Sequence, residues 1–195
     1  MPHPNRFHSC PFAPLQIGLQ GQYASWAGIL VGLGPQLVIV AEDEKSAEES
    51  TMRLARVGIE NVAGYLDGGI FAWQQAGLPL NEVPQISVLQ LHEEMSAHPE
   101  GIQLLDVRRP MEWDAGHLEH ARLKPLHQLR ESLADVDRAR PVATLCRSGY
   151  RSSIATSILK TAGFEQVMNV TGGYDAWRAH ELPYAKGAGR SPCSR

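Results

Sequence analysis

The stretch that decides the fold is Val142-Ala143-Thr144-Leu145-Cys146-Arg147-Ser148-Gly149-Tyr150-Arg151-Ser152. Its first four residues predict a short buried strand, and the residues from about Arg151 to Ala162 have the pattern of a helix. Strand, loop and helix in this order are part of a βαβ unit, which implies parallel strands covered by helices. The sequence therefore predicts an α/β fold with Cys146 in the loop between a strand and a helix.

The same order of segments occurs earlier in the chain. Leu37-Val38-Ile39-Val40 leads into Ala41 and then into a helical stretch that ends near Val57. Matching landmarks follow in both halves: Gly58 and Gly163 are 105 residues apart, and Trp73 and Trp177 are 104 residues apart. We interpret this as a tandem duplication. It predicts two α/β domains, at residues 1–84 and 85–186, followed by a flexible C-terminal tail at residues 187–195.

The second of these domains has a full set of predicted elements. Leu80–Gln85 has the composition of a linker, and Ser87 with Gln90 forms a capping box for a helix that extends to about Ala97. A strand is predicted at 102–106 before the strand that leads into Cys146. The first domain has no counterpart of the strand at 102–106, so we expect it to be truncated at its N-terminal side.

Composition excludes several classes of function. The chain has 195 residues, is 43% hydrophobic and carries a formal charge of −3, which gives no reason to expect nucleic acid as a partner. It has neither a stretch of 18 apolar residues nor an N-terminal secretory signal, so we expect a cytoplasmic protein with no membrane partner. Three sparse cysteines favour neither a disulfide framework nor a metal site, and we expect no cofactor. Cys10 and Cys193 are interpreted as incidental.

Cys146 stands in surroundings suited to a reactive thiol. A thiol acts as a nucleophile only as thiolate, and an ordinary cysteine with a pKa of about 8.5 is mostly protonated at neutral pH. A helix start, loop amides, and the charges of Arg147 and Arg151 all favour an anion at this position. Gly149 lets the short loop curl. A buried structural cysteine is the alternative, but two arginines and a glycine are poor neighbours for an inert thiol.

The chain resembles the rhodanese family of sulfurtransferases. The resemblance rests on the loop with four residues between Cys146 and Arg151, on Leu105-Asp106-Val107-Arg108 followed by Glu112-Trp113 and Gly116-His117, and on Gly172-Gly173-Tyr174-Asp175-Ala176-Trp177. It covers residues 87–183. After His117 the chain reads Leu118-Glu119-His120-Ala121-Arg122, which departs from the family pattern, so we expect the crossover there to be rebuilt.

The resemblance implies roles for the loop residues. Cys146 would take a sulfane sulfur from a small-molecule donor, hold it as a persulfide and pass it to a small-molecule acceptor. Backbone amides from Arg147 through Ser148 and Gly149 to Arg151 would cradle the outer sulfur, Arg151 would brace the loop, and Arg147 with Tyr150 would shape donor choice. Ser152 could cap the helix or touch the persulfide, and we favour capping. Hydrogen-bonded structural roles are expected for His117 and Asp106.

The first copy should be catalytically silent. Aligned without gaps, it places Ala41 at Cys146 and Ser46 at Arg151, and three consecutive acids at Glu42, Asp43 and Glu44 would repel an anionic donor. The segment Gln20-Gly21-Gln22-Tyr23-Ala24-Ser25-Trp26-Ala27-Gly28 resembles the silent rhodanese-like domain of metallo-β-lactamase fusion proteins of persulfide metabolism, and the order of a silent and then an active copy matches theirs. That resemblance implies a persulfide dioxygenase of this type as a domain or partner. The sequence carries no pattern that predicts an oligomeric state.

Two other functions compete with sulfur transfer. Cysteine phosphatases and arsenate reductases also hold a thiolate in an anion-binding loop, but they place five residues between Cys and Arg, whereas Cys146 and Arg151 have four between them. The smaller ring favours a single sulfur over a tetrahedral oxyanion. A non-catalytic interaction module is the other alternative, and the intact Cys146 loop argues against it for the second copy only.

Overall fold

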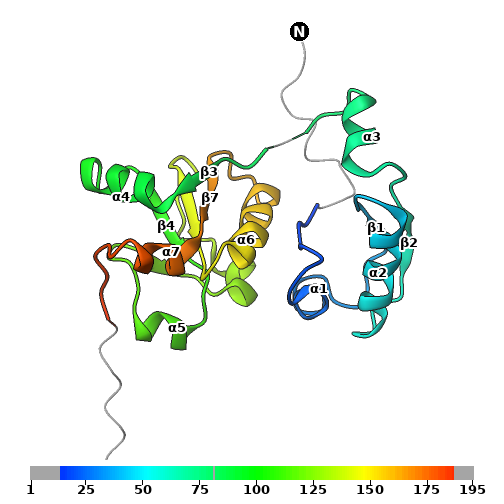
Figure 1. Ribbon diagram of the computed structural model, residues 1–195, viewed down its shortest axis with the longest axis horizontal. Helices are drawn as coiled ribbons and strands as arrows, with labels where there is room; N and C mark the ends of the chain where they lie inside the picture. Colours follow the sequence, from blue (N-terminus) through cyan, green and yellow to red (C-terminus); the bar gives the residue numbers. More distant parts are fainter. Residues whose placement is uncertain (1–13, 81, 187–195) are drawn as a thin grey trace, which may run out of the picture. The chain divides into compact units, whose positions relative to one another are not determined.

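A computed structural model describes residues 14–80 and 82–186, which form two compact units (Figure 1). The smaller unit contains residues 17–82, and the larger unit contains residues 83–186 together with residues 14–16. The predicted tail, the start of the chain with no expected secretory signal, and both Cys10 and Cys193 lie outside the described residues. None of the described helices has the length and apolar character that a membrane crossing requires.

The larger unit is built on a five-stranded parallel sheet with the order β3-β7-β6-β4-β5. The central strand β6 (Val142–Leu145) is buried at every residue and lies between β7 (Val167–Thr171) and β4 (Gln103–Asp106). The edges are formed by β3 (Gln85–Ser87) and β5 (Arg122–Leu123). Strands buried on both faces are typical of parallel sheets with helices on each side.

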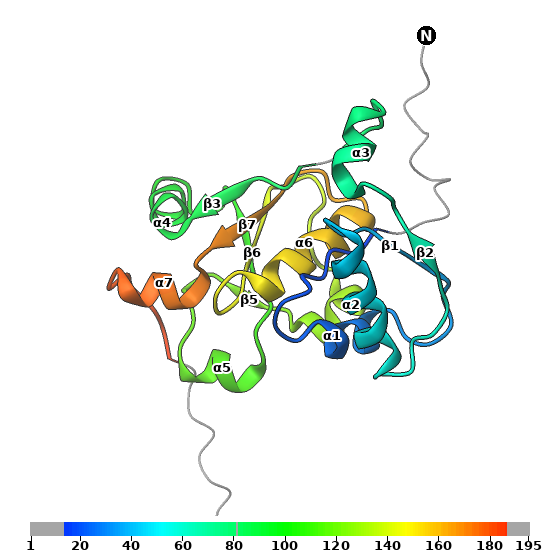
Figure 2. The ribbon, with the colours of Figure 1, turned by 45° about the vertical axis from the view of Figure 1, so that its right-hand side comes forward.

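Helices cover both faces of this sheet, and Figures 1 and 2 show α4 and α7 on one side and α6 on the other. α4 (Val88–Ala97) packs against α7 (Gly173–Ala179), while α6 (Tyr150–Thr161) packs with the 3-10 helix η2 (Leu126–Ser132). α5 (Pro110–Ala115) follows β4. Residues 14–16 run along α6, where the amide of Gln16 donates to Ser157 Oγ at 3.2 Å.

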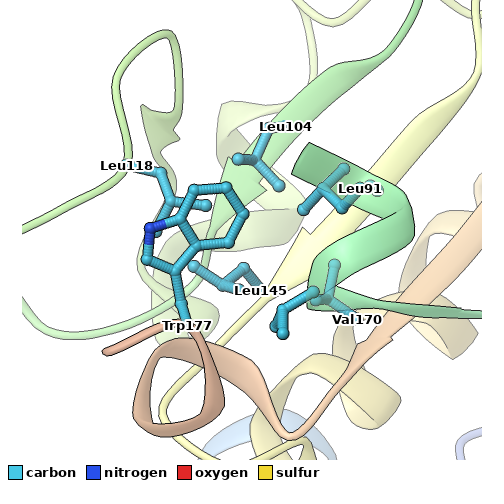
Figure 3. Close-up of a cluster of buried hydrophobic side chains, with 8 residues drawn as sticks. Leu91, Leu104, Leu118, Leu145, Val170 and Trp177 are labelled. Carbon is cyan, nitrogen blue, oxygen red and sulfur yellow. The ribbon is translucent and has the colours of Figure 1, made fainter. Parts of the chain in front are cut away.

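Two apolar clusters hold the sheet between these layers. On the α4 side, the indole of Trp177 lies across Leu118, Leu104 and Leu145, with Leu91 and Val170 completing the packing (Figure 3). On the α6 side, Leu105, Val142, Leu159, Phe164 and Val167 are all buried together with Val136. Burial of this kind contributes roughly 1.5–3 kcal/mol for each large side chain, so the strand before Cys146 is fixed from both faces.

The predicted start of the larger unit is partly confirmed. Ser87 and Gln90 form the capping box, and α4 ends at Ala97 as predicted. The linker prediction was wrong at Gln85, which begins strand β3. This edge strand has three residues with Ile86 as its one apolar side chain, so it is too short for an alternating pattern to be recognised, and it is held mainly through backbone pairing with β7.

The smaller unit contains a two-stranded parallel sheet, β1 (Leu37–Ile39) and β2 (Val62–Tyr65). It also contains α1 (Tyr23–Leu30), α2 (Glu44–Ala55) and α3 (Gly69–Gln75). Figure 2 shows α1 and α2 on one side of the two strands. The buried cluster of the unit lies on that side and consists of Ala27, Ile39, Ala47, Leu54 and Ile59.

The two units repeat several local contacts. In the smaller unit Trp73 Nε1 donates to the Pro79 carbonyl at 3.1 Å, and in the larger unit Trp177 Nε1 donates to the Pro183 carbonyl at 2.8 Å. A Cβ on Gly69 would clash with the Ala41 carbonyl, and a Cβ on Gly173 would clash with the Cys146 carbonyl. The order β1, α2, β2, α3 thus corresponds to the order β6, α6, β7, α7 in local geometry as well as in sequence.

Candidate active site

Cys146 follows β6 at the carboxyl edge of the sheet, where ligands bind in open parallel sheets. Its side chain is 1% exposed. Gly149, at φ +110°, turns the chain into α6, which begins at Tyr150. A backbone at this φ favours glycine. The sulfur therefore lies inside a tight loop in front of the first turn of a helix.

Two hydrogen-bond donors face the sulfur. The amide of Gly149 lies 3.1 Å from Cys146 Sγ, and the hydroxyl of Ser152 lies 3.4 Å from it. Both groups can donate to a thiolate, and hydrogen bonds to a charged acceptor are stronger than neutral ones. The loop is thus arranged to stabilise negative charge on Sγ and on any atom bound to it.

The preference for Ser152 as a helix cap was wrong. The N-cap of α6 is Gly149, and no side chain caps the helix. Ser152 is the third residue of the helix and is fully buried, and its one hydroxyl proton can be donated either to the Gly149 carbonyl at 3.0 Å or to Sγ at 3.4 Å. The early glycine in the loop starts the helix before Arg151, which places Ser152 beneath the sulfur instead of at the helix end.

The start of α7 fixes the backbone of the loop. The amides of Tyr174 and Asp175 donate to the carbonyls of Cys146 and Arg147 at 2.8 and 2.9 Å. Gly173 allows this approach, because a Cβ there would clash with the Cys146 carbonyl and would lie 2.7 Å from the Arg147 carbonyl carbon. The loop carbonyls are therefore held by α7.

Arg151 braces the loop through an ion pair with α5. Its guanidinium makes two parallel hydrogen bonds of 2.6 Å to the Glu112 carboxylate, which also accepts from the Arg109 amide at 3.1 Å. The side chains are 15% and 31% exposed, so the pair is only partly screened by water. The hydrogen bond from Arg151 lowers the pKa of Glu112 from 4.5 to about 2, and the same bond raises the pKa of Arg151.

This ion pair predicts a pH dependence of stability. Because the pKa of Glu112 is depressed on folding, its contribution is complete above about pH 4.5 and is lost as pH falls towards 2. We expect Glu112→Gln to cost about 1–2 kcal/mol of unfolding free energy at pH 7. The difference from wild type should disappear below pH 2 in chemical denaturation series. Asp114→Asn, which removes an exposed carboxylate from the same helix, is the control, and an equally large effect there would contradict the assignment.

The other predicted site residues line the loop. Arg147 and Ser148 are exposed, Tyr150 is half-buried, and Arg147 Nε lies 3.0 Å from Asp175 Oδ2. Each arginine that we expected to add positive charge at the sulfur is thus paired with a carboxylate. Pairing reduces the net field of the two guanidinium groups, so the amide and hydroxyl donors carry more of the anion stabilisation than the sequence suggests.

Asp106 and His117 have structural roles, as predicted. Asp106 is fully buried and accepts from the amide and guanidinium of Arg108, which lies over the ring of Tyr174 at 4.0 Å. His117 stacks on Trp113 and its Nδ1 lies 3.1 Å from the Trp113 carbonyl. These contacts join the turn after β4 to α5 and α7, the two helices that contact the Cys146 loop.

The sequence did not assign three residues of the site, namely Glu112, Gly173 and Asp175. Glu112 and Gly173 were within recognised motifs, but their functions depend on partners 39 and 27 positions away in the chain. The Gly-Gly pair before a helix was a usable signal, since such a pair indicates a close backbone approach. Within the part of the chain that the structure describes, no group of three or more His, Cys, Asp and Glu side chains is placed to hold a metal ion.

Comparison with known proteins supports the resemblance of the larger unit to rhodaneses. Residues 88–180 match the family model of the rhodanese-like domain. A protein named sulfurtransferase from Allochromatium vinosum is 34% identical over 104 residues, which cover 53% of this chain and 94% of that protein. The thiosulfate sulfurtransferase GlpE from Pseudomonas putida is 31% identical over 97 residues, covering 50% and 84%. The solution structure of the rhodanese-like domain of Alr3790 from Anabaena sp. covers 58% of this chain and 88% of its own, with a TM-score of 0.51 and 25% identity.

Proposed function

The chain belongs to the rhodanese-like family, and on that premise we propose that it is a sulfurtransferase that carries sulfur on Cys146. The observation that supports this most strongly is the arrangement of the Gly149 amide and the Ser152 hydroxyl around Sγ. The sulfur donor is a sulfane-sulfur compound such as thiosulfate or a persulfide, and the sulfur acceptor is a thiophilic small molecule.

The transfer takes place in two displacement steps. The Cys146 thiolate attacks the outer sulfur of the donor, a new S–S bond forms, and the rest of the donor leaves with the electron pair of the broken bond. The acceptor then attacks the outer sulfur of the persulfide, and the Cys146 thiolate leaves. A covalent intermediate of this kind gives ping-pong kinetics.

We assign the remaining loop residues to binding and support. The amides from Arg147 to Arg151 receive the outer sulfur and the departing anion, and Arg151 holds the loop through Glu112. Arg147 and Tyr150 stand at the loop surface, where they shape the choice of donor together with Ser148. Asp175 pairs with Arg147 and so limits how strongly that arginine attracts an anionic donor.

We propose further that residues 1–84 are a silent copy and residues 85–186 the active one. Ala41 follows β1 as Cys146 follows β6, and the acidic segment after it begins α2, where Asp43 accepts from the Ser46 amide at 2.7 Å. Asp43 thus caps the helix, and Glu44 lies in its first turn. On this view the protein acts in the cytoplasm on small molecules, in a persulfide or sulfide detoxification system with a metallo-β-lactamase-type persulfide dioxygenase as its domain or partner.

One comparison of substrates tests this proposal. The purified chain is assayed with thiosulfate and with glutathione persulfide as donors, using cyanide, sulfite or a thiol as acceptor, and in parallel with a phosphate ester and with arsenate. We expect turnover with at least one sulfur donor and none with the oxyanions. Turnover of the oxyanions instead would favour a phosphatase or arsenate reductase, and no turnover at all would favour an interaction module.

The hydroxyl of Ser152 predicts a specific effect on transfer. Ser152→Ala should slow persulfide formation by roughly tenfold, because one of the donors to the sulfur is lost, and it should cost about 1 kcal/mol of stability. Ser153→Ala is the matched control, since Ser153 donates to the Tyr150 carbonyl three residues earlier at 2.8 Å. Rapid-mixing rates and thermal unfolding of the two variants provide the measurement, and an equal loss of rate in both would contradict a role for Ser152 at the sulfur.

A further inference from the structure

One side of the smaller unit exposes large apolar side chains. Val38 and Val40 at β1, Tyr65 at the end of β2, and Ile70, Trp73 and Leu78 in and after α3 are all exposed. We call this set the open face. The opposite side of the same strands is buried against α1 and α2. Parallel sheets are normally covered on both faces, and an exposed apolar patch of this kind marks a site of interaction.

The open face corresponds position by position to a buried cluster of the larger unit. Val40 is the equivalent of Leu145 in the repeat, and the two residues are 56% and 0% exposed. Tyr65 stands where Val170 does, at 42% and 0%, and Trp73 stands where Trp177 does, at 37% and 3%. The equivalents of Val38 and Leu78 are Ala143 and Leu182, which also belong to that cluster. These positions are buried, or for Leu182 partly buried, in the larger unit and exposed in the smaller one.

Most of the cover that buries these positions in the larger unit comes from one continuous segment, β3-α4-β4, with Leu118 added from a later part of the chain. In the larger unit, Val88 and Leu91 of α4 and Leu104 of β4 pack on these positions, as Figure 3 shows for Leu91 and Leu104 against Leu145, Val170 and Trp177. The same segment supplies both neighbouring strands, because β3 pairs with β7 and β4 pairs with β6. Within residues 17–80 and 82, no strand pairs with the outer edge of β1 or of β2.

We propose that the open face binds a strand–helix–strand segment of a partner polypeptide. Its two strands would add in parallel to the outer edges of β2 and β1, as β3 and β4 add to β7 and β6. Its helix would place two apolar residues three positions apart, as Val88 and Leu91 are, on Val40, Tyr65 and Trp73. Strand addition supplies backbone hydrogen bonds, and the apolar helix face supplies specificity. This inference does not depend on the chemistry of Cys146.

A peptide with the sequence of residues 84–107 of this chain is a suitable probe, because it contains β3, α4 and β4. Hydrogen–deuterium exchange of the full chain is followed by mass spectrometry with and without the peptide. We expect saturable protection in β1, β2 and α3, with exchange slowed by roughly tenfold or more. The same segment joined to the N-terminus through a flexible linker raises its effective concentration to about the millimolar range and should give the same protection.

Matched variants make the result specific. Val40→Asp should abolish the protection, whereas Met52→Asp, at 55% exposure on α2 and outside the open face, should retain it. A peptide carrying Val88→Ser and Leu91→Ser should not slow hydrogen exchange in β1, β2 or α3. Exchange within α2 serves as the check that each variant is folded.

Three results would overturn the proposal. One is that neither the free nor the linked segment slows hydrogen exchange in β1, β2 and α3. Another is slow exchange of β1, β2 and α3 in the chain alone together with a dimer in light scattering, which would assign the open face to a second copy. The third is slow exchange in a monomeric chain, which would assign the cover to the rest of the same chain.

Discussion

Replacing Cys146 with serine will abolish sulfur transfer, with a fall in turnover of at least about 10³-fold. A serine hydroxyl cannot hold sulfur as a persulfide, and its higher pKa leaves almost no anion at neutral pH. The Gly149 amide and the Ser152 hydroxyl are arranged around a sulfur atom, and they cannot compensate for the loss of the nucleophile. Steady-state assays with thiosulfate or glutathione persulfide measure the effect.

The matched control is the double variant Cys10→Ser and Cys193→Ser, which leaves Cys146 as the one cysteine of the sequence. This variant should keep wild-type turnover, while Cys146→Ser should keep the wild-type unfolding midpoint within a few degrees. Residual turnover of Cys146→Ser near the wild-type level would show that the sulfur is carried elsewhere.

Gly173→Ala should damage both the fold and the site, although Gly173 belongs to α7 and Cys146 to the loop after β6. At φ +55° a side chain is strained, and the added Cβ would clash with the backbone of Cys146 and Arg147. Because backbone atoms cannot move aside as a flexible side chain can, we expect a loss of about 3–4 kcal/mol in unfolding free energy. Displacement of the loop should also slow persulfide formation by roughly 10²-fold.

Gly163→Ala is the control for this prediction. Gly163 has φ +88° in the same unit, but its Cβ would meet only the end of the Arg138 side chain, at 3.2 Å. Gly163→Ala should lower the unfolding free energy by only about 1–2 kcal/mol and leave the rate of sulfur transfer unchanged. Equal losses in the two variants, measured by denaturant unfolding and rapid mixing, would show that the contact between α7 and the loop has no special role.

The strands with continuous apolar runs and the capped helix could be predicted from the sequence. β6 and α4 have local signals, a buried apolar run and a Ser-x-x-Gln capping box, and both were correct. β3 and β5 were not identified, because short edge strands are stabilised by backbone pairing with neighbours that are distant in sequence. The repeat of segments predicted the order of elements from β1 onward in the smaller unit but not α1, which precedes them.

The site was predictable where the signal is local to the loop. Spacing between Cys146 and Arg151 located the loop, and Gly149 indicated its turn. The partners that fix it could not be assigned, since Glu112 and Gly173 come from α5 and α7 and meet the loop only after folding. The direction of the Ser152 hydroxyl depends on the residue at which α6 begins. A shift of that start by one or two residues decides whether Ser152 caps the helix or faces the sulfur.

The central claim is tested most directly by intact-mass and peptide mass spectrometry after incubation with a sulfur donor under non-reducing conditions. We expect a gain of about 32 Da, the mass of one sulfur atom, located on the peptide that contains Cys146 and removed by cyanide or a thiol. Cys146→Ser should show no gain. Absence of the adduct from the wild-type chain, or its persistence in Cys146→Ser, would contradict the assignment of Cys146 as the carrier of sulfur.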